Sequence, residues 1–312
     1  MREEYLLNKT SIKDSIAFKN REGNEKIFKY IFLSAALISV ISVIAIIVFV
    51  FGKGIRPFFG DDAYSFTNFI TGLRWAPSDN EFGIFYMIAG SLLSTLGAIV
   101  LGVPVGLLTA VYIAELAPKK IEAILRPAIE LLAGIPSVIF GVFGLGIIVP
   151  IIKDISPQQS GQSMLAVILV LTMMILPTII SLSLSSIRAI PKSYKDASYG
   201  LGASKIQTIF KCILPAAKSG ILAAVVLGIG RAIGETTAVM MVAGNNSGGI
   251  PLSIWDKTRP LTSNVAMEMG YASGQHQELL FSTGVVLFIF IMVINYVLIK
   301  ITSKVGSEGE KR

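Results

Sequence analysis

Two oppositely charged residues, Arg231 and Glu235, lie inside an otherwise apolar stretch of the chain, Ser219–Ala243. A charged side chain at the middle of a bilayer costs about 2.5–3.5 kcal/mol, so neither residue is expected to face lipid. A spacing of four residues places both on one face of a helix, where they can pair. The planar guanidinium group also matches the geometry of an oxyanion. The pattern therefore predicts either a buried ion pair that fixes helix packing or a site for an anion crossing the membrane.

In the second interpretation the carboxylate of Glu235 holds the guanidinium group of Arg231 in place while the path is empty. It also weakens the site, so that the anion can leave again. Thr236 and Thr237 add hydroxyl groups directly after the pair. We expect Arg231, Glu235, Thr236 and Thr237 to line the path of the substrate.

A polar, lysine-rich segment, residues 188–218, separates two apolar stretches and is far longer than a simple connection requires. We call it the island. Ser193, followed three residues later by Asp196, has the form of a capping box that starts a helix. Gly200 and Gly202 permit a tight turn after that helix.

The second half of the island carries the signals of another helix. Ser204 is a plausible N-cap, and Pro215 is expected to end the helix. Between them, apolar residues recur at the spacing of one helix face: Ile206, Ile209, Phe210 and Ile213. The island is therefore predicted to be a helix–turn–helix element with one face resting on the membrane part of the protein.

The elements around the island are predicted to cross a membrane. Hydrophobic residues make up 53% of the 312 residues and charged residues only 15%, against roughly 25% charged residues in soluble domains. A span needs about 20 apolar residues. Six stretches reach that length: Tyr30–Phe51, Phe85–Tyr112, Leu131–Ile152, Met164–Ile187, Ser219–Ala243 and Leu279–Ile299.

The distribution of Lys and Arg predicts the orientation of these spans. The N-terminal segment, the loops at 113–130 and 188–218 and the C-terminal tail together carry 20 of these residues, whereas the alternate loops carry 6. Positive residues are retained on the cytoplasmic side. We therefore expect both termini and the island in the cytoplasm, with residues 1–29 and 302–312 as tails and 30–301 as one six-span domain.

Composition also narrows the chemistry. The single Cys212 excludes an internal disulfide framework and a cysteine-based zinc site, and the single His276, expected as a loop residue, removes most metal and acid–base sites. No Gly-x-x-x-x-Gly-Lys-Ser/Thr motif for nucleotide phosphates occurs, so an ATPase that drives transport must be a separate chain. Trp75 and Trp255, in the outer segments, are expected to anchor in the headgroup zone.

The island resembles the cytoplasmic loop of the inner-membrane permeases of binding-protein-dependent ABC importers. That loop has a Glu-Ala-Ala motif, a Gly six residues after the Glu, and an Ile-x-Leu-Pro ending. This chain has Asp196-Ala197-Ser198, then Gly202, and then Cys212-Ile213-Leu214-Pro215, so Asp196, Ser198 and Cys212 depart from the motif while its spacing is kept. The resemblance implies a coupling helix in a groove of the ATPase, with these docking residues: Asp196, Ala197, Ser198, Gly202, Ala203, Leu214 and Pro215.

Further motifs between about Trp75 and Leu298 resemble permeases of the phosphate-specific transport system. They are Gly230–Val239 (Gly-Arg-Ala-Ile-Gly-Glu-Thr-Thr-Ala-Val), Gly134–Gly141 (Gly-Ile-Pro-Ser-Val-Ile-Phe-Gly), Pro191-x-x-Tyr194-x-Asp196-Ala197-Ser198, and Gly270–His276. The family resemblance implies that the matching Arg231 and Glu235 take part in phosphate passage. It also implies one half of a permease heterodimer, together with two ATP-binding subunits and an extracytoplasmic phosphate-binding protein.

The sequence therefore predicts an all-α membrane protein with six transmembrane helices of the ABC-importer permease type and a cytoplasmic coupling helix. We expect it in the cytoplasmic membrane of a prokaryote, in contact with lipid and without nucleic acid as a partner. No cofactor or metal is expected on this chain, with ATP and Mg²⁺ bound by the partner ATPase. Alternatives are a permease for sulfate, molybdate or tungstate, a passive anion channel, and a membrane-embedded enzyme, for which the chain offers few catalytic groups.

Overall fold

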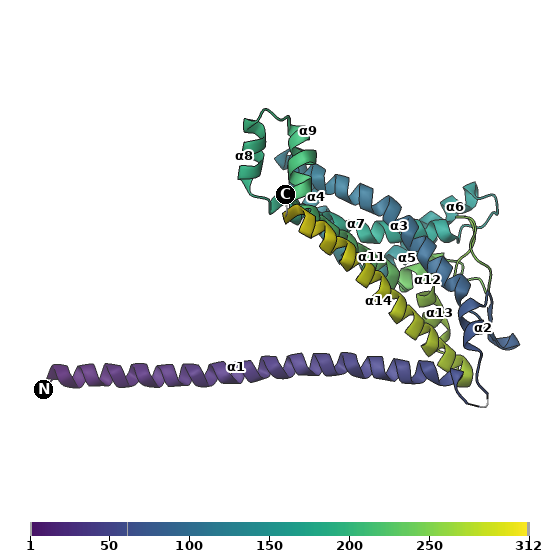
Figure 1. Ribbon diagram of the computed structural model, residues 1–312, viewed down its shortest axis with the longest axis horizontal. Helices are drawn as coiled ribbons and strands as arrows, with labels where there is room; N and C mark the ends of the chain where they lie inside the picture. Colours follow the sequence, from purple (N-terminus) through teal and green to yellow (C-terminus); the bar gives the residue numbers. More distant parts are fainter. Residues whose placement is uncertain (1, 61, 311–312) are drawn as a thin grey trace. The chain divides into compact units, whose positions relative to one another are not determined.

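The computed structural model describes the backbone of residues 2–60 and 62–310 and the side chains of residues 27–60 and 62–300 (Figure 1). The chain divides into two units, Met1–Gly52 and Lys53–Arg312. From Arg2 onward the first unit belongs to one long helix, α1 (Arg2–Ile55). A candidate span, Ile27–Phe58, begins in this helix and ends with the short helix that follows it. The segment expected as an N-terminal tail is thus helical from Arg2 onward; most of its side chains lie outside the described residues.

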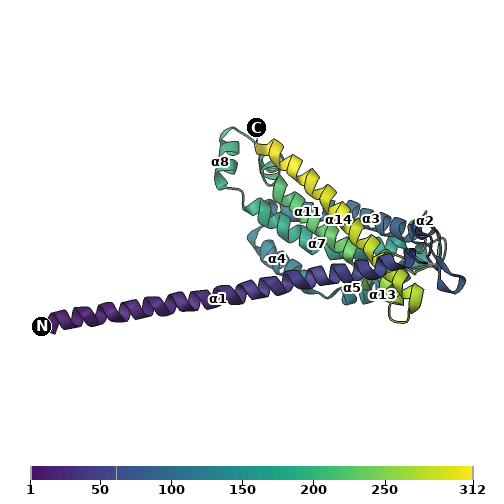
Figure 2. The ribbon, with the colours of Figure 1, turned by 60° about the horizontal axis from the view of Figure 1, so that its bottom comes forward.

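The second unit is a bundle of long helices with small elements at its two ends (Figures 1 and 2). The long helices lie side by side in both views: α3 (Phe85–Val111), α7 (Met164–Arg188), α11 (Lys218–Gly234) and α14 (Gly274–Glu310). At one end project α8 (Lys192–Gly200) and α9 (Lys205–Thr208), near the C-terminal end of α14. The island and the C-terminal end of α14 therefore lie at the same end of this bundle.

Shorter elements complete the bundle. They are η1 (Arg56–Phe58), α2 (Phe66–Thr71), η2 (Pro77–Asp79), α4 (Lys119–Gly134), α5 (Ser137–Phe143), α6 (Val149–Ile155), α10 (Leu214–Ala216), α12 (Thr237–Val242) and α13 (Leu261–Glu268). Three π-helical turns join consecutive helices: η3 (Tyr112–Leu116), η4 (Gly144–Ile148) and η5 (Ile209–Ile213). The described residues also contain one small β-hairpin, β1 (Trp75–Ala76) paired antiparallel with β2 (Glu81–Phe82), which the all-α prediction did not include.

Among the residues that the structure describes, five helices are long and apolar enough to cross a membrane, and a bent pair counted as one span makes six, the number that the sequence predicted. The five are Ile27–Phe58, Phe85–Leu116, Ser137–Ile155, Met164–Arg188 and Gly274–Lys300; the pair is Lys205–Ala216 with Lys218–Gly234, bent by 70°. The third span begins later than predicted. Residues 131–134 belong to α4, and the chain is extended at Ile135 and Pro136, because proline disfavours helix in the residue before it.

The helices α3 and α7 pack closely because small residues of α3 face branched residues of α7. A Cβ atom added at Gly102 would lie 2.7 Å from Ile175 Cδ1, and one at Gly106 would lie 2.8 Å from Ile179 Cγ2. Ile175 and Ile179 are fully buried. Small residues that let helices approach are a common basis of helix association in membranes, where the hydrophobic effect between helices is weak. This rigid pair positions the polar residues at the middle and at the end of α7.

Candidate functional site

The fifth predicted span is interrupted where its charged residues lie. Helix α11 ends at Gly234, Glu235 is extended (φ −70°, ψ 128°), and α12 begins only at Thr237. The prediction that Arg231 and Glu235 share one face of a continuous helix is therefore wrong. Gly234 lacks a side chain to stabilise the helix, and the polar side chains that follow it hydrogen-bond the backbone locally, which favours a break.

Glu235 and the two threonines stabilise this break. Oε1 of Glu235 accepts a hydrogen bond from the backbone N–H of Ala238, at 3.0 Å, and thereby satisfies a free donor in the first turn of α12. The carbonyl oxygen of Glu235 accepts from Oγ1 of Thr262, also at 3.0 Å. Oγ1 of Thr236 donates to the carbonyl oxygen of Gly234 at 3.3 Å. The freed backbone groups are thus partly satisfied by side chains.

Arg231 lies in the last turn of α11 and forms a hydrogen bond with a residue other than Glu235. Its Nη1 donates to Oγ1 of Thr178 in α7, at 3.4 Å. Among the ion pairs formed by residues 27–60 and 62–300, none joins Arg231 to Glu235. Because the guanidinium group carries five N–H donors, a long hydrogen bond to one hydroxyl leaves most of its capacity for other acceptors.

The four residues predicted to line the path are brought together at the helix break. Arg231, Glu235, Thr236 and Thr237 are all partly buried, neither sealed in the core nor fully exposed. Helical backbone is interrupted inside a membrane only where protein or a water-filled cavity surrounds the break. Polar groups at such a break, at the ends of two half-helices, are suited to binding an ion in the membrane.

Sequence reasoning missed Thr178 and Thr262, which contact the predicted residues. Thr178 directly follows Pro177 inside the fourth span. Because proline interrupts the backbone hydrogen bonds of a helix, the hydroxyl group beside it could have been identified from the sequence as a candidate site residue. Thr262 lies in α13, a short helix that no apolar periodicity marked. Thr262 contacts Glu235 only because the chain reverses direction between them, and no local pattern in the sequence predicts that reversal.

The island forms the predicted helix–turn–helix element, with one cap differing from the prediction. Helix α8 begins after Pro191, and Ser193 lies inside it, so the capping box of Ser193 and Asp196 is not formed. Pro191 occupies the N-cap position instead, so Ser193 lies too late in the chain to cap the helix. Ser204 is confirmed as an N-cap: its Oγ accepts from the backbone N–H of Gln207 at 3.3 Å, and Oε1 of Gln207 accepts from the N–H of Ser204 at 2.8 Å.

The turn between α8 and α9 depends on one glycine. Gly202 has φ +81°, a conformation that residues with a Cβ atom rarely adopt, whereas Gly200 is the last residue of α8 and does not need its freedom. Pro215 does not end the second helix. The helix continues through η5 and α10 to Ala216, and the 70° bend follows there.

Only half of the apolar face predicted for the second island helix is buried. Ile209 and Ile213 are 2% and 0% exposed and pack with residues of α3 and α7, whereas Ile206 and Phe210 are each 53% exposed. None of the residues of α8 is buried, and Leu201 in the turn is 90% exposed. The element thus rests on the bundle through α9 and η5 and presents α8 outward.

Five of the seven predicted docking residues lie in α8 and the turn after it, whereas Leu214 and Pro215 lie at the other end of the second island helix, where Leu214 packs against the bundle core. Asp196, Ala197 and Ser198 lie in α8, Gly202 and Ala203 in the turn, and Leu214 and Pro215 in α10. The two helices are joined by a hydrogen bond of 2.9 Å between Oγ of Ser198 and Oγ1 of Thr208.

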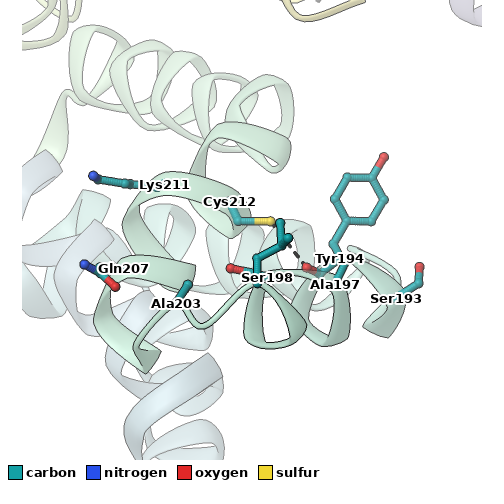
Figure 3. A pocket seen from close by; sticks show the side chains of 9 residues that line it. Ser193, Tyr194, Ala197, Ser198, Ala203, Gln207, Lys211 and Cys212 are labelled. Atoms are coloured by element: carbon teal, nitrogen blue, oxygen red, sulfur yellow. Dashed lines mark hydrogen bonds between the residues drawn. The ribbon is translucent and has the colours of Figure 1, made fainter.

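An open hollow of about 700 Å³ lies between the two island helices. Figure 3 shows Tyr194, Ala197 and Ser198 of α8 on one side of it and Gln207, Lys211 and Cys212 on the other. The hollow and the exposed turn give the island a shape with both projecting and recessed surfaces.

A second polar cluster lies at the opposite end of the bundle and is centred on Glu268, at the end of α13. One of its carboxylate oxygens accepts from Nε1 of Trp75 at 2.7 Å and lies 2.7 Å from Nε2 of His276, while the other bonds to Arg259. Trp75 is only 1% exposed, so the prediction that it anchors in the headgroup zone is wrong. The cluster joins the β-hairpin to α13 and α14.

The partners of Glu268 determine its charge. Burial raises the pKa of Glu268, but the hydrogen bond from Trp75, the positive charge of Arg259 and the further hydrogen bonds outweigh burial and lower its pKa below the ordinary value. Burial, together with the charge of Glu268, raises the pKa of the neighbouring Tyr271. Because Glu268 and Arg259 are each only 5% exposed, their pairing is required for the charges to be tolerated there.

The sequence of this chain is similar to those of known transport permeases. The model of the family described as "Binding-protein-dependent transport system inner membrane component" matches residues 102–304. The probable ABC transporter permease protein YqgH of Bacillus subtilis is 38% identical over 286 residues, covering 89% of this chain and 92% of that protein. The phosphate transport system permease protein PstC of Pasteurella multocida is 31% identical over 239 residues, covering 70% of this chain and 74% of that protein.

Solved structures share the fold. A bacterial ABC transporter involved in the import of the acidic polysaccharide alginate matches with a TM-score of 0.63 and 15% identity, covering 90% of this chain and 98% of that one. An inward-facing structure of the methionine ABC transporter MetNI matches with a TM-score of 0.53 and 21% identity, covering 72% and 94%. At these identities the likeness concerns the arrangement of helices alone.

Proposed function

Because the chain belongs to the family of binding-protein-dependent transport system inner membrane components, we propose that it is the permease subunit of an ATP-driven phosphate importer. It is a multi-pass membrane protein of the ABC importer type and is the permease component, not the ATPase. The observation that carries the choice of an anion is Arg231 at an interrupted membrane helix, where its guanidinium group has one hydrogen bond, to Thr178, among the described residues. Relatives about 30% identical that are named phosphate permeases support phosphate as the cargo.

In this proposal the anion passes the break between α11 and α12. The guanidinium group of Arg231 binds it as a planar fork of donors, and the hydroxyl groups of Thr236 and Thr237 replace part of its hydration shell. Glu235 supports the break through Ala238 and places negative charge near the site, which keeps the affinity for the anion low enough for release. A carrier must bind its cargo and let it leave.

The island transmits force from the ATPase in this proposal. Helix α8 and Leu201 project from the bundle without burial, as a surface that docks into another protein requires. The docking residues are Asp196, Ala197, Ser198, Gly202, Ala203, Leu214 and Pro215. Two ATP-binding subunits, which hold ATP and Mg²⁺, close on each other and push the island, and α9 and η5 pass the motion to α3 and α7, against which they pack.

The remaining partners follow from the two ends of the bundle. The island end, where α14 also ends, faces the cytoplasm, in agreement with the excess of Lys and Arg in these segments. The excess of Lys and Arg in the N-terminal segment and in the C-terminal tail supports a cytoplasmic location for both chain termini. The end with the β-hairpin and α13 faces the phosphate-binding protein that delivers the anion. A second, homologous permease subunit completes the path.

The test is ATP-driven uptake of labelled phosphate by the reconstituted complex, with sulfate and molybdate as competitors. We expect phosphate uptake that requires ATP hydrolysis, that unlabelled phosphate suppresses, and that sulfate and molybdate suppress poorly. Arg231→Gln is expected to abolish this uptake while the complex still assembles in the membrane.

Other outcomes would assign a different function. Uptake suppressed by sulfate or molybdate but not by phosphate would replace the cargo and keep the architecture. Anion flux that continues without ATP would indicate a passive channel. Normal phosphate uptake by the Arg231→Gln complex would refute the role of this residue.

A further inference from the structure

A stripe of polar residues runs along one face of α7 from the partner of Arg231 to the island end of the helix. Its members are Thr178, Ser181, Ser185 and Arg188, at spacings of three, four and three residues. At 100° per residue these positions fall within about 80° of one another around the helix. Ten residues of α-helix span about 15 Å, so the stripe covers the island-side half of the membrane.

The stripe ends abruptly at Thr178. On the same face toward the other end of α7 lie Met174 and Leu171, which are 1% and 2% exposed and belong to the apolar core of the bundle. A polar group inside a membrane is costly unless it faces protein or a wet cavity. On this face, the half of α7 nearer the island is polar, and the other half is closed by apolar packing. This is the arrangement expected for a route that opens only toward the island end.

A hollow of about 260 Å³ lies along the island-side part of this stripe, from Ser181 to Arg188, between α7 and α4; Thr178 does not line it, and Ile129, Ile180 and Leu184 add apolar surface. Its α7 wall includes Ser181, Ser185 and Arg188, and its α4 wall includes Arg126 and Glu130. The volume is sufficient for a tetrahedral oxyanion with several water molecules, since one water molecule occupies about 30 Å³ of liquid.

Both arginines of the hollow form ion pairs with carboxylates. Nε of Arg126 donates to Glu130 Oε1 at 3.1 Å within one turn of α4, and Arg188 bonds to Glu122. Each guanidinium group keeps further N–H donors beyond these pairs. The pairs are partly exposed, with 56% and 61% of the side chains exposed for Arg126 and Glu130, so exchange of one acceptor for another costs little.

We propose that this hollow is a second oxyanion site, through which phosphate leaves toward the cytoplasm after passing Arg231. The anion is handed from Arg231 and Thr178 to the hydroxyl groups of Ser181 and Ser185 and then to Arg126 and Arg188. The carboxylates of Glu130 and Glu122 compete with it for the guanidinium groups. That competition keeps the affinity low where the cargo must be released.

This inference rests on the proposed function, because it takes the island end as cytoplasmic and the cargo as an oxyanion. Its competing explanation is a hollow that is filled by water only. The hydroxyl group of Ser185 donates to the carbonyl oxygen of Ser181 at 2.9 Å, an ordinary bond within a helix. The hydroxyl groups alone therefore do not distinguish an anion site from a water-filled hollow.

The test uses the single cysteine of the chain. Cys212→Ser gives a chain without cysteine, and Ser181→Cys then places a unique thiol in the hollow. The full complex is reconstituted with its ATPase side accessible and treated with a membrane-impermeant thiosulfonate that carries a sulfonate group. The rate of modification is measured with inorganic phosphate, sulfate or molybdate and with chloride of equal ionic strength.

We expect phosphate to slow modification of Ser181→Cys about tenfold when its concentration is about ten times its dissociation constant, since occupied sites are protected. Chloride should leave the rate unchanged. The matched control is Leu182→Cys, the next residue of α7 on a different face and outside the hollow, where phosphate should give no protection.

The outcomes separate this inference from the proposed function. Protection by sulfate or molybdate in place of phosphate would refute the proposed cargo and support the route. No protection by any of the three anions, or equal protection at Leu182→Cys, would overturn the route, whatever the uptake assay shows. A thiol at 181 that does not react at all, in a complex that still transports, would overturn it as well.

Discussion

Lys195 of α8 donates from Nζ to both carboxylate oxygens of Glu115, at 2.6 and 2.8 Å. Glu115 lies in the π-helical turn η3 that ends α3, and its side chain is only 8% exposed. The pair therefore connects the outward helix of the island directly to a membrane-spanning helix. π-Helical turns are frequently found at functional sites and mark places where a helix adjusts its register.

The first prediction concerns this ion pair as a mechanical link. Lys195→Met is expected to lower phosphate transport per ATP hydrolysed, because motion of α8 then reaches α3 less directly. The buried carboxylate of Glu115 also loses its partner, at about 1–3 kcal/mol. The exchanged pair, Lys195→Glu with Glu115→Lys, should restore part of the coupling. Transport that stays fully coupled in Lys195→Met would contradict the link.

The second prediction concerns the shape of the cation at the helix break. Arg231→Lys keeps the positive charge but replaces a planar fork of donors by a point charge. We expect phosphate uptake to fall at least about tenfold, which corresponds to about 1.4 kcal/mol of lost stabilisation of the passing anion. Arg56→Lys, in an ion pair whose arginine side chain is 70% exposed, is the matched control and should transport normally.

The third prediction separates the two roles of Glu235. Glu235→Gln retains an Oε1 atom that accepts from the N–H of Ala238, so the helix break should persist while the negative charge is lost. We expect the complex to hold phosphate more tightly and to turn over more slowly. Glu235→Ala removes the hydrogen bond as well, at about 1 kcal/mol, and should also lower thermal stability. Faster turnover in Glu235→Gln would argue against a release role.

The sequence predicted those parts of the fold that depend on local composition. Apolar length predicted the membrane spans other than the fifth, which breaks after Gly234, and Ser204 with its following residues predicted the start of α9. Ser193 failed as a cap because α8 begins at Lys192, with Pro191 in the N-cap position, so Ser193 already lies inside the helix. The burial of Ile209 and Ile213, but not of Ile206, was not predictable, since it depends on where α3 and α7 lie.

The candidate site was predicted by residue type but not by geometry. Arg231 and Glu235 were identified because charges in apolar stretches are rare. Their helix breaks between them, because Gly234 and the hydroxyl of Thr236 offer the backbone an alternative that hydropathy does not register. The contacts of Arg231 with Thr178 and of Glu235 with Thr262 depend on packing between distant segments, which no local pattern encodes.

The fourth prediction concerns the turn of the island. Gly202→Ala places a Cβ atom on a residue with φ +81°, which costs roughly 1–2 kcal/mol although the surrounding space is open. We expect weaker assembly with the ATPase subunits, measured by co-purification from the membrane. Gly200→Ala is the matched control, since it lies in α8 with open space around it, and alanine should stabilise the helix. Equal loss of assembly in both variants would show that any side chain in this region disturbs docking.

The fifth prediction concerns the pH dependence that Glu268 gives to the opposite end of the bundle. Because its pKa in the folded protein is lower than the ordinary value of 4.5, the folded state binds its proton less readily than the unfolded chain. Glu268 therefore stabilises the fold above about pH 4.5, and this contribution is lost as the pH falls below that value toward the pKa of the folded state. The thermal unfolding midpoint of the purified protein in detergent should decrease over this range.

In Glu268→Gln, the decrease in thermal unfolding midpoint that protonation of Glu268 causes at acid pH should be absent. The variant should be less stable than the parent at pH 7, because Arg259 and Trp75 lose a charged acceptor. Asp154→Asn, which removes an exposed carboxylate at the end of α6, should leave the profile of the parent unchanged. If Glu268→Gln kept the full decrease in unfolding temperature between pH 5 and pH 3.5, the acid sensitivity would have to come from other carboxylates, and the cluster around Glu268 would not control the stability of this end.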